Sequence, residues 1–181
     1  MFLAIDSVSS GMKGDLNTLK KVCRYASTVM FVGEIVFIGL ILAMLVLGVV
    51  SQFSDSGKDI LLEMIDSDGS DGLRTFSSFV VMLLILILGF ITVWKVHDIM
   101  VSIKTEYTPF ILENAKRIKF VSLAFLFASV FLLVFGILAE KSVTNILFLF
   151  FGSLMASVVM YCLTIVTRYG ALLQKESDET L

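Results

Sequence analysis

Glu34 is the acidic residue whose position points most directly to chemistry. It is the only charged residue in an apolar stretch that runs from residue 29 to residue 50. A carboxylate in hydrocarbon is costly, so it should face other helices or water and find a partner. The functional interpretation is a proton- or cation-coupled site. The structural interpretation is a carboxylate near the membrane boundary that reaches Lys21, Arg24 or the lipid headgroups.

The other reactive side chains do not assemble into a catalytic or metal-binding set. The single histidine, His97, precedes Asp98, and because neighbours on a helix point in different directions we expect no joint role for them. Cys23 and Cys162 form no CxxC, and one histidine cannot complete a zinc-type cluster. No HExxH or GxSxG motif and no paired membrane acids occur. The sequence therefore predicts a non-enzymatic protein with no metal and no cofactor, and an intramembrane enzyme is the least favoured alternative.

These residues must be positioned by membrane-spanning helices. Hydrophobic residues make up 57% of the 181 residues and charged residues 17%, whereas soluble domains have about 45–50% and about 25%. A helix needs about 20 apolar residues to cross a bilayer. Four stretches meet this requirement, at residues 29–50, 76–96, 118–139 and 143–167. The predicted fold class is all-α: a single membrane domain over residues 1–181, built as an antiparallel bundle of four transmembrane helices.

The distribution of lysine and arginine predicts the orientation. Eleven of the 14 basic residues lie before the first span, after the fourth, or in the region between the second and third, with Lys95 and Lys119 at the adjoining ends of those two spans. Basic residues favour the cytoplasmic side. We therefore expect an outer loop at 51–75, a cytoplasmic loop at 97–117 and a cytoplasmic tail at 168–181, in a multi-pass protein of the cell membrane. Residues 15–27 have apolar positions at helical spacing and predict an N-terminal interfacial helix. The net charge of −2 gives no basic footprint for direct nucleic-acid binding.

Local patterns predict further contacts. Residues 58–65 could form a short helix with its apolar side on the membrane or the bundle. Small residues four apart mark places where helices can approach closely, within the chain or in a homo-oligomer. These pairs are Gly39 and Ala43, Ala124 and Ala128, and Gly152 and Ala156.

The cytoplasmic loop carries a helix start signal. Thr108-Pro109 is typical of an N-cap followed by proline at the first helical position, so the third long helix should begin at Pro109. Phe110, Asn114 and Arg117 recur at intervals of four and three, which would place them on one face.

Two spaced motifs occur beside the predicted spans. One reads Pro109-Phe110-x3-Asn114-x3-Ile118 at the start of the third span. The other reads Gly170-x2-Leu173-Gln174-x-Glu176-x-Asp178-x-Thr180 in the tail. They resemble the "PF…N…L" and "GxxLQxExDxT" signatures of a bacterial four-helix membrane family, known as domain of unknown function 2975, which includes YoaS-like proteins. Ile118 stands where that family usually has leucine.

The resemblance implies a regulatory role. Genes of the family often lie beside one for a small helix-turn-helix regulator of the Cro/CI type, which implies a membrane protein that holds or releases a cytoplasmic transcription regulator. Composition alone predicts an irregular acidic tail. As a latch, Glu176 and Asp178 could pair with basic residues of the cytoplasmic loop, namely Lys116, Arg117 or Lys119; alternatively they could face a basic DNA-binding partner. The competing hypothesis is a small proton-coupled transporter or efflux protein that uses Glu34.

Overall fold

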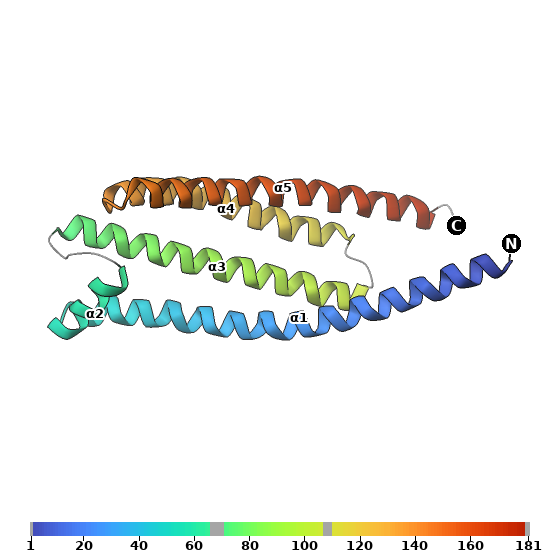
Figure 1. Cartoon of the computed structure of the whole chain (residues 1–181), viewed down its shortest axis with the longest axis horizontal. Coiled ribbons are helices and arrows are strands. Elements are labelled where there is room, and N and C mark those ends of the chain that lie inside the picture. The colour runs from blue at the N-terminus through green and yellow to red at the C-terminus, as the bar shows by residue number, and fades with distance from the viewer. Residues whose placement is uncertain (1, 66–70, 107–109, 180–181) are drawn as a thin grey trace.

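The chain folds into helices joined by short connections, as a computed structural model describes for residues 2–65, 71–106 and 110–179. The helices are α1 (Phe2–Val50), α2 (Asp55–Ile65), α3 (Gly72–Glu106), α4 (Leu112–Leu138) and α5 (Val143–Glu179). Within those ranges no strand occurs (Figure 1). Four segments are long and apolar enough to cross a membrane: Lys21–Val50, Gly72–Thr105, Leu112–Leu138 and Val143–Ser177. The predicted all-α fold with four spanning helices is confirmed, and the chain is a multi-pass membrane protein.

The long helices pack in chain order. α1 contacts α3, α3 contacts α4, and α4 contacts α5, whereas the described parts of α1 contact neither α4 nor α5. α3 therefore lies between α1 and the α4–α5 pair (Figure 1). Both termini and the α3–α4 connection lie at one end of the molecule, here called the terminal end. α2 and the α4–α5 turn lie at the opposite end, here called the hairpin end.

The helices at the terminal end extend beyond what a bilayer requires. α5 has 37 residues, which corresponds to a length of about 56 Å, whereas the hydrocarbon core is about 30 Å thick. The irregular tail expected from composition is therefore wrong, because α5 continues to Glu179. An ion pair between Lys175 Nζ and Glu179 Oε1, at 3.5 Å and one turn apart, supports this last segment.

Two predicted helix boundaries differ from the structure. Residues 15–27 are helical, as predicted, but they are continuous with the first span inside α1. α4 begins at Leu112 and not at Pro109, which lies outside the described residues. Ile111 is extended, with φ −120° and ψ 147°, and no side chain caps the helix. Phe110 consequently precedes α4 and does not share a helical face with Asn114 and Arg117.

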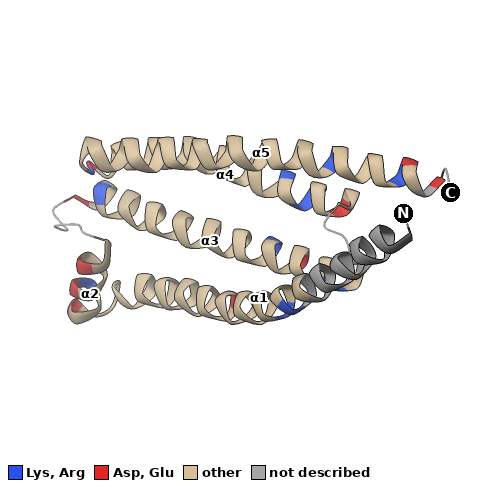
Figure 2. Cartoon of the chain, turned by 45° about the vertical axis from the view of Figure 1, so that its right-hand side comes forward, with Lys and Arg blue, Asp and Glu red and all other residues tan. Residues whose placement is uncertain are grey.

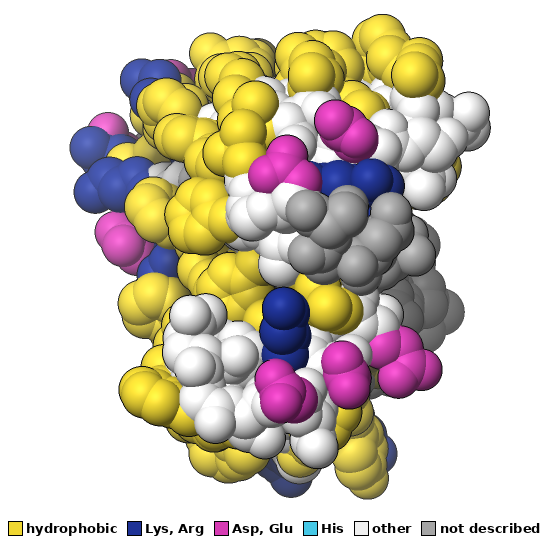
Figure 3. Space-filling view, turned by 90° about the vertical axis from the view of Figure 1, so that its left-hand side faces the viewer, with side chains coloured by type: hydrophobic (Ala, Val, Ile, Leu, Met, Phe, Trp, Pro, Cys, Tyr) yellow, Lys and Arg dark blue, Asp and Glu magenta, His cyan; other side chains and the backbone are white. Residues whose placement is uncertain are grey.

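α2 closes the hairpin end of the molecule. As predicted, residues 58–65 are helical, and Leu61 and Ile65 are buried against Met44 of α1 and Leu86 of α3. Lys141 Nζ, in the α4–α5 turn, donates a hydrogen bond of 2.6 Å to the Ile65 carbonyl. Figure 3 views this end, where acidic and basic side chains gather on the face and hydrophobic side chains surround them. These contacts connect α2 to α1 and α3 on one side and to the α4–α5 turn on the other.

Small residues make only some of the predicted contacts. Ala128 is buried beside Val81 of α3 and Leu132, which confirms a close approach there. A methyl group added at Gly39 or Gly152 would meet nothing within 4 Å. These two glycines are therefore not used for packing within the chain.

Serines join α4 to α5 inside the membrane. Ser122 Oγ donates to the Ser157 carbonyl at 3.0 Å, and Ser157 Oγ donates to the Ser122 carbonyl at 2.9 Å. Ser153 Oγ donates to the Phe125 carbonyl at 2.8 Å. Hydroxyl groups that bond to a neighbouring backbone satisfy themselves without water and hold the two helices close.

Removing the reciprocal serine pair should weaken the α4–α5 hairpin moderately. We expect the Ser122→Ala/Ser157→Ala double variant to lose about 1–2 kcal/mol of unfolding free energy, because membrane interhelical hydrogen bonds contribute about 0.6 kcal/mol each on average. Unfolding by SDS in mixed micelles measures the loss. Thr28→Ala is the control, because Thr28 Oγ1 donates a hydrogen bond to the Arg24 carbonyl of its own helix. Equal losses in the two variants would contradict a role in joining the helices.

Candidate functional site

Glu34 pairs with His97 across the α1–α3 contact. Glu34 Oε1 lies 2.6 Å from His97 Nδ1, and the two side chains are 16% and 20% exposed. When the carboxylate is ionised the imidazole must donate this hydrogen bond. The Phe31 ring lies 6.1 Å from the His97 ring, centre to centre. The pair is thus a largely enclosed acid–imidazole contact between two spanning helices.

This pairing corrects the predicted partners of Glu34. Lys21 and Arg24 were expected because they lie close in sequence, but the partner of Glu34 is His97, which is 63 residues away. The expected separation of His97 from Asp98 is confirmed, since Asp98 Oδ2 pairs with Lys95 Nζ at 3.3 Å. The sequence offers one partial signal, an acid and the single histidine on two long apolar helices, but it does not show which faces of these helices meet.

A second polar cluster joins α3 to α4. Arg117 Nη1 donates to the Asp98 carbonyl and to Asn114 Oδ1, both at 3.0 Å. Asn114 is 0% exposed. The bond to Asn114 lies within α4, whereas the bond to the Asp98 carbonyl crosses to α3, so a different rotation of α4 would deprive the guanidinium of that acceptor. Asn114 therefore positions the guanidinium that bonds to α3.

The two motif segments meet where Phe110 packs on α5. A Cβ atom added at Gly170 would lie 2.6 Å from Phe110 Cδ1 and 3.0 Å from Phe110 Cγ. The ring therefore lies against the α5 backbone, and only glycine leaves room for it. This contact brings the segment before α4 and the last turns of α5 together, which the sequence alone did not predict.

The remaining motif residues lie farther along α5. Leu173 is 49% exposed, and Gln174 and Glu176 are also exposed. Asp178 belongs to the helical backbone of α5, whereas Pro109 and Thr180 lie outside the described residues.

Two of the three basic residues expected to bind the tail latch have other contacts. Lys116 Nζ lies 3.6 Å from Glu113 Oε2, and Arg117 bonds to Asp98 and Asn114. The latch between Glu176 or Asp178 and this loop stays a prediction.

Together these contacts link all four long helices near the terminal end. Glu34–His97 joins α1 to α3, Arg117–Asp98 joins α3 to α4, and Phe110–Gly170 joins the start of α4 to α5. We call these six residues and Asn114 the terminal cluster. Figure 2 shows that charged residues gather toward the two ends of the molecule.

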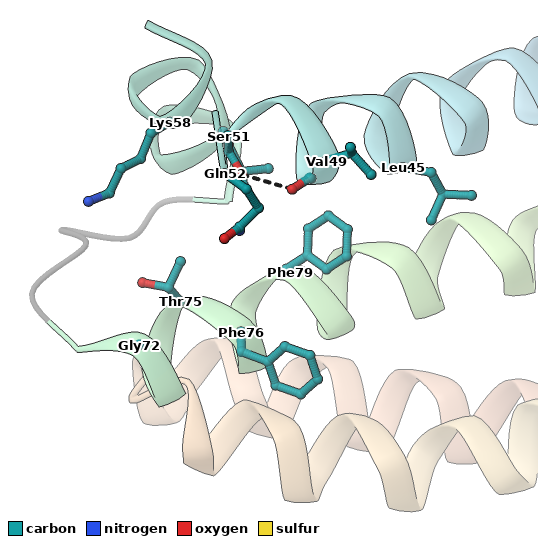
Figure 4. A pocket seen from close by; sticks show the side chains of 11 residues that line it. Leu45, Val49, Ser51, Gln52, Lys58, Gly72, Thr75, Phe76 and Phe79 are labelled. Atoms are coloured by element: carbon teal, nitrogen blue, oxygen red, sulfur yellow. Dashed lines mark hydrogen bonds between the residues drawn. The ribbon is translucent and has the colours of Figure 1, made fainter. Parts of the chain in front are cut away.

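A cavity of about 490 Å³ lies at the hairpin end, between α1, α2 and α3 (Figure 4). Its walls are mainly apolar, and its polar lining residues are Ser51, Gln52, Lys58 and Thr75. The Phe79 ring borders it and lies against α1, where a methyl added to Gly48 would be 3.0 Å from Phe79 Cζ. This lining contains no acid and no histidine, so the cavity offers no acid–base pair.

The contacts described above join helices to one another. Within residues 2–65, 71–106 and 110–179 no group of three potential metal ligands gathers. Comparisons with protein-family models, with curated proteins and with solved structures found no match to this chain.

Proposed function

We propose that this chain is a non-enzymatic regulatory membrane protein whose terminal end faces the cytoplasm and binds a soluble partner. The observation that carries the proposal is the packing of Phe110 on Gly170, which joins the loop motif and the tail motif in one surface. The family resemblance suggests a small helix-turn-helix regulator as the partner. The excess of basic residues at this end supports the cytoplasmic orientation.

The last turns of α5 have the chemistry of a recognition helix. Leu172 and Leu173 are 43% and 49% exposed, and the acidic Glu176 and Glu179 follow on the same helix. An exposed helix of this kind can enter an apolar groove on a partner. Its acidic residues complement the basic surface of a DNA-binding protein and would speed association.

Recovery of soluble proteins from a cell extract tests the proposal. The full chain, immobilised in detergent, should retain a small basic protein that a variant ending at Tyr169 does not retain. Glu176→Gln/Glu179→Gln keeps the helix but removes the charges, so we expect it to retain about tenfold less partner at physiological salt, as charge complementarity predicts. Equal recovery by all three proteins would count against a role for the tail.

Labelling of introduced cysteines tests the orientation separately. In a background with Cys23 and Cys162 replaced by serine, an impermeant reagent added to intact cells should label a Ser56→Cys variant and leave a Thr105→Cys variant unlabelled. The opposite pattern would place the terminal end outside the cell and exclude a cytoplasmic partner there.

A proton-coupled transporter is the second candidate, and the enclosed Glu34–His97 pair favours it. An acid and an imidazole that share a hydrogen bond in a membrane can exchange a proton when helices move. In liposomes with an imposed pH gradient, uptake of ethidium that disappears in Glu34→Gln would support transport. Ethidium uptake identical to that of protein-free liposomes would count against transport of this cation by the Glu34–His97 pair.

A further inference from the structure

A hollow of about 330 Å³ lies between α4 and α5 near the terminal end. Its lining combines a small apolar floor with three cations, and the six residues are Leu112, Ala115, Lys116, Lys119, Thr164 and Arg168. Ala115 and Thr164 are 4% and 7% exposed, so the floor is part of the helix contact. The cations are exposed around it. None of these residues except Lys116 belongs to a contact described above.

Among the described residues, the three cations of the hollow have one carboxylate partner, Glu113 beside Lys116. In the described part of the chain no carboxylate forms an ion pair with Lys119 or Arg168. Lys116 Nζ lies 3.6 Å from Glu113 Oε2, with both side chains more than half exposed, a geometry of little energetic weight. Three like charges around one hollow repel each other, so an anion between them would lower the electrostatic energy.

The cations lie at the expected depth of the lipid headgroups. Hydropathy places the membrane boundaries of α4 and α5 at residues 118 and 167, so Lys119 is the second residue of one span and Arg168 directly follows the other. At this depth the anion available in high concentration is the phosphate of a phospholipid. Leu112 and Ala115, the apolar residues of the lining, suit the glycerol and acyl portion of such a lipid.

We propose that the hollow between α4 and α5 binds an anionic phospholipid, with its headgroup phosphate held by Lys116, Lys119 and Arg168. A free phosphate ion is the less suitable occupant, because it would leave the apolar floor uncovered. The proposal is independent of the soluble partner. Since Arg168 precedes Gly170 by two residues, a bound lipid would hold the segment of α5 that packs on Phe110.

Native mass spectrometry of the full-length protein tests this site. Protein in mixed detergent micelles is offered phosphatidylglycerol and phosphatidylcholine with identical acyl chains, in equal amounts. The wild type should retain at least one phosphatidylglycerol in preference to phosphatidylcholine. Lys119→Gln/Arg168→Gln should reduce phosphatidylglycerol affinity by about 10- to 30-fold, as expected for two headgroup contacts.

A matched variant separates a built site from general charge. Lys21→Gln/Lys104→Gln removes two exposed cations from the same end, outside the hollow, and its affinity should stay within about twofold of wild type. Equal losses in the two double variants, or no preference for phosphatidylglycerol in the wild type, would overturn the proposal. Displacement of the lipid by millimolar inorganic phosphate would also overturn it, by identifying the free ion as the occupant. Unchanged circular dichroism confirms that both variants are folded.

Discussion

Replacing His97 by leucine is expected to lower the free energy of unfolding by about 3 kcal/mol. The substitution leaves the Glu34 carboxylate, only 16% exposed, without its hydrogen-bond partner between two spanning helices. Removing one member of a buried ionic or hydrogen-bonded pair costs about 3–5 kcal/mol, because the remaining group keeps its desolvation cost and loses its partner. The lower end applies here because both side chains are partly exposed. SDS titration in mixed micelles, followed by the fluorescence of the single tryptophan, Trp94, measures the change near the site.

A double-mutant cycle distinguishes loss of the pair from loss of one side chain. Glu34→Leu/His97→Leu removes both polar groups and should recover most of the stability, since two apolar side chains can face each other or lipid. Glu113→Gln breaks the exposed contact with Lys116 and should cost less than about 0.5 kcal/mol. If the His97→Leu variant were as stable as Glu113→Gln, the Glu34–His97 pair would contribute nothing measurable to the free energy of unfolding.

The elements that hold the site could be predicted because they depend on local composition. Each spanning helix is a long apolar run with a length set by the bilayer, and the short connection between α4 and α5 forces them to be antiparallel. The helix at residues 58–65 could be predicted for a similar reason, since Leu61 and Ile65 recur at helical spacing. These features require no knowledge of how one helix is rotated against another.

The contacts inside the site depend on that rotation, and the sequence does not reveal it. A helix that is apolar on all sides has no polar face to mark which side meets its neighbour. Glu34 therefore gave no indication that it faces α3, and its long-range partner His97 was replaced by nearby cations in the prediction. The tail was mispredicted for a related reason: its composition is typical of an irregular segment, but it continues a long helix and packs through Gly170 on Phe110.

Replacing Gly170 by leucine is expected to displace Phe110 and open the segment between α3 and α4. The new Cβ would lie 2.6 Å from Phe110 Cδ1, a separation that side-chain atoms cannot adopt, so the ring must leave α5. Helix propensity favours leucine over glycine by about 0.8 kcal/mol, so α5 itself should persist. We expect trypsin to cleave after Lys104 or Lys116 about tenfold faster than in the wild type. Recovery of the proposed soluble partner should fall by about tenfold, which corresponds to about 1.4 kcal/mol of binding free energy.

Gly152→Leu is the matched control, because it places the same side chain on the same helix where no atom lies within 4 Å. Its cleavage rate and partner recovery should equal those of the wild type. The Phe110→Ala/Gly170→Leu double variant has no clash, but the segment between α3 and α4 stays open because the ring is absent. Trypsin should therefore cleave this variant rapidly, and it should retain little of the proposed partner. Rapid cleavage with full partner recovery would show that Phe110 orders the segment without forming the binding surface. An unchanged cleavage rate in Gly170→Leu would mean that the ring does not rest on α5, and the surface proposed from that contact would have to be abandoned.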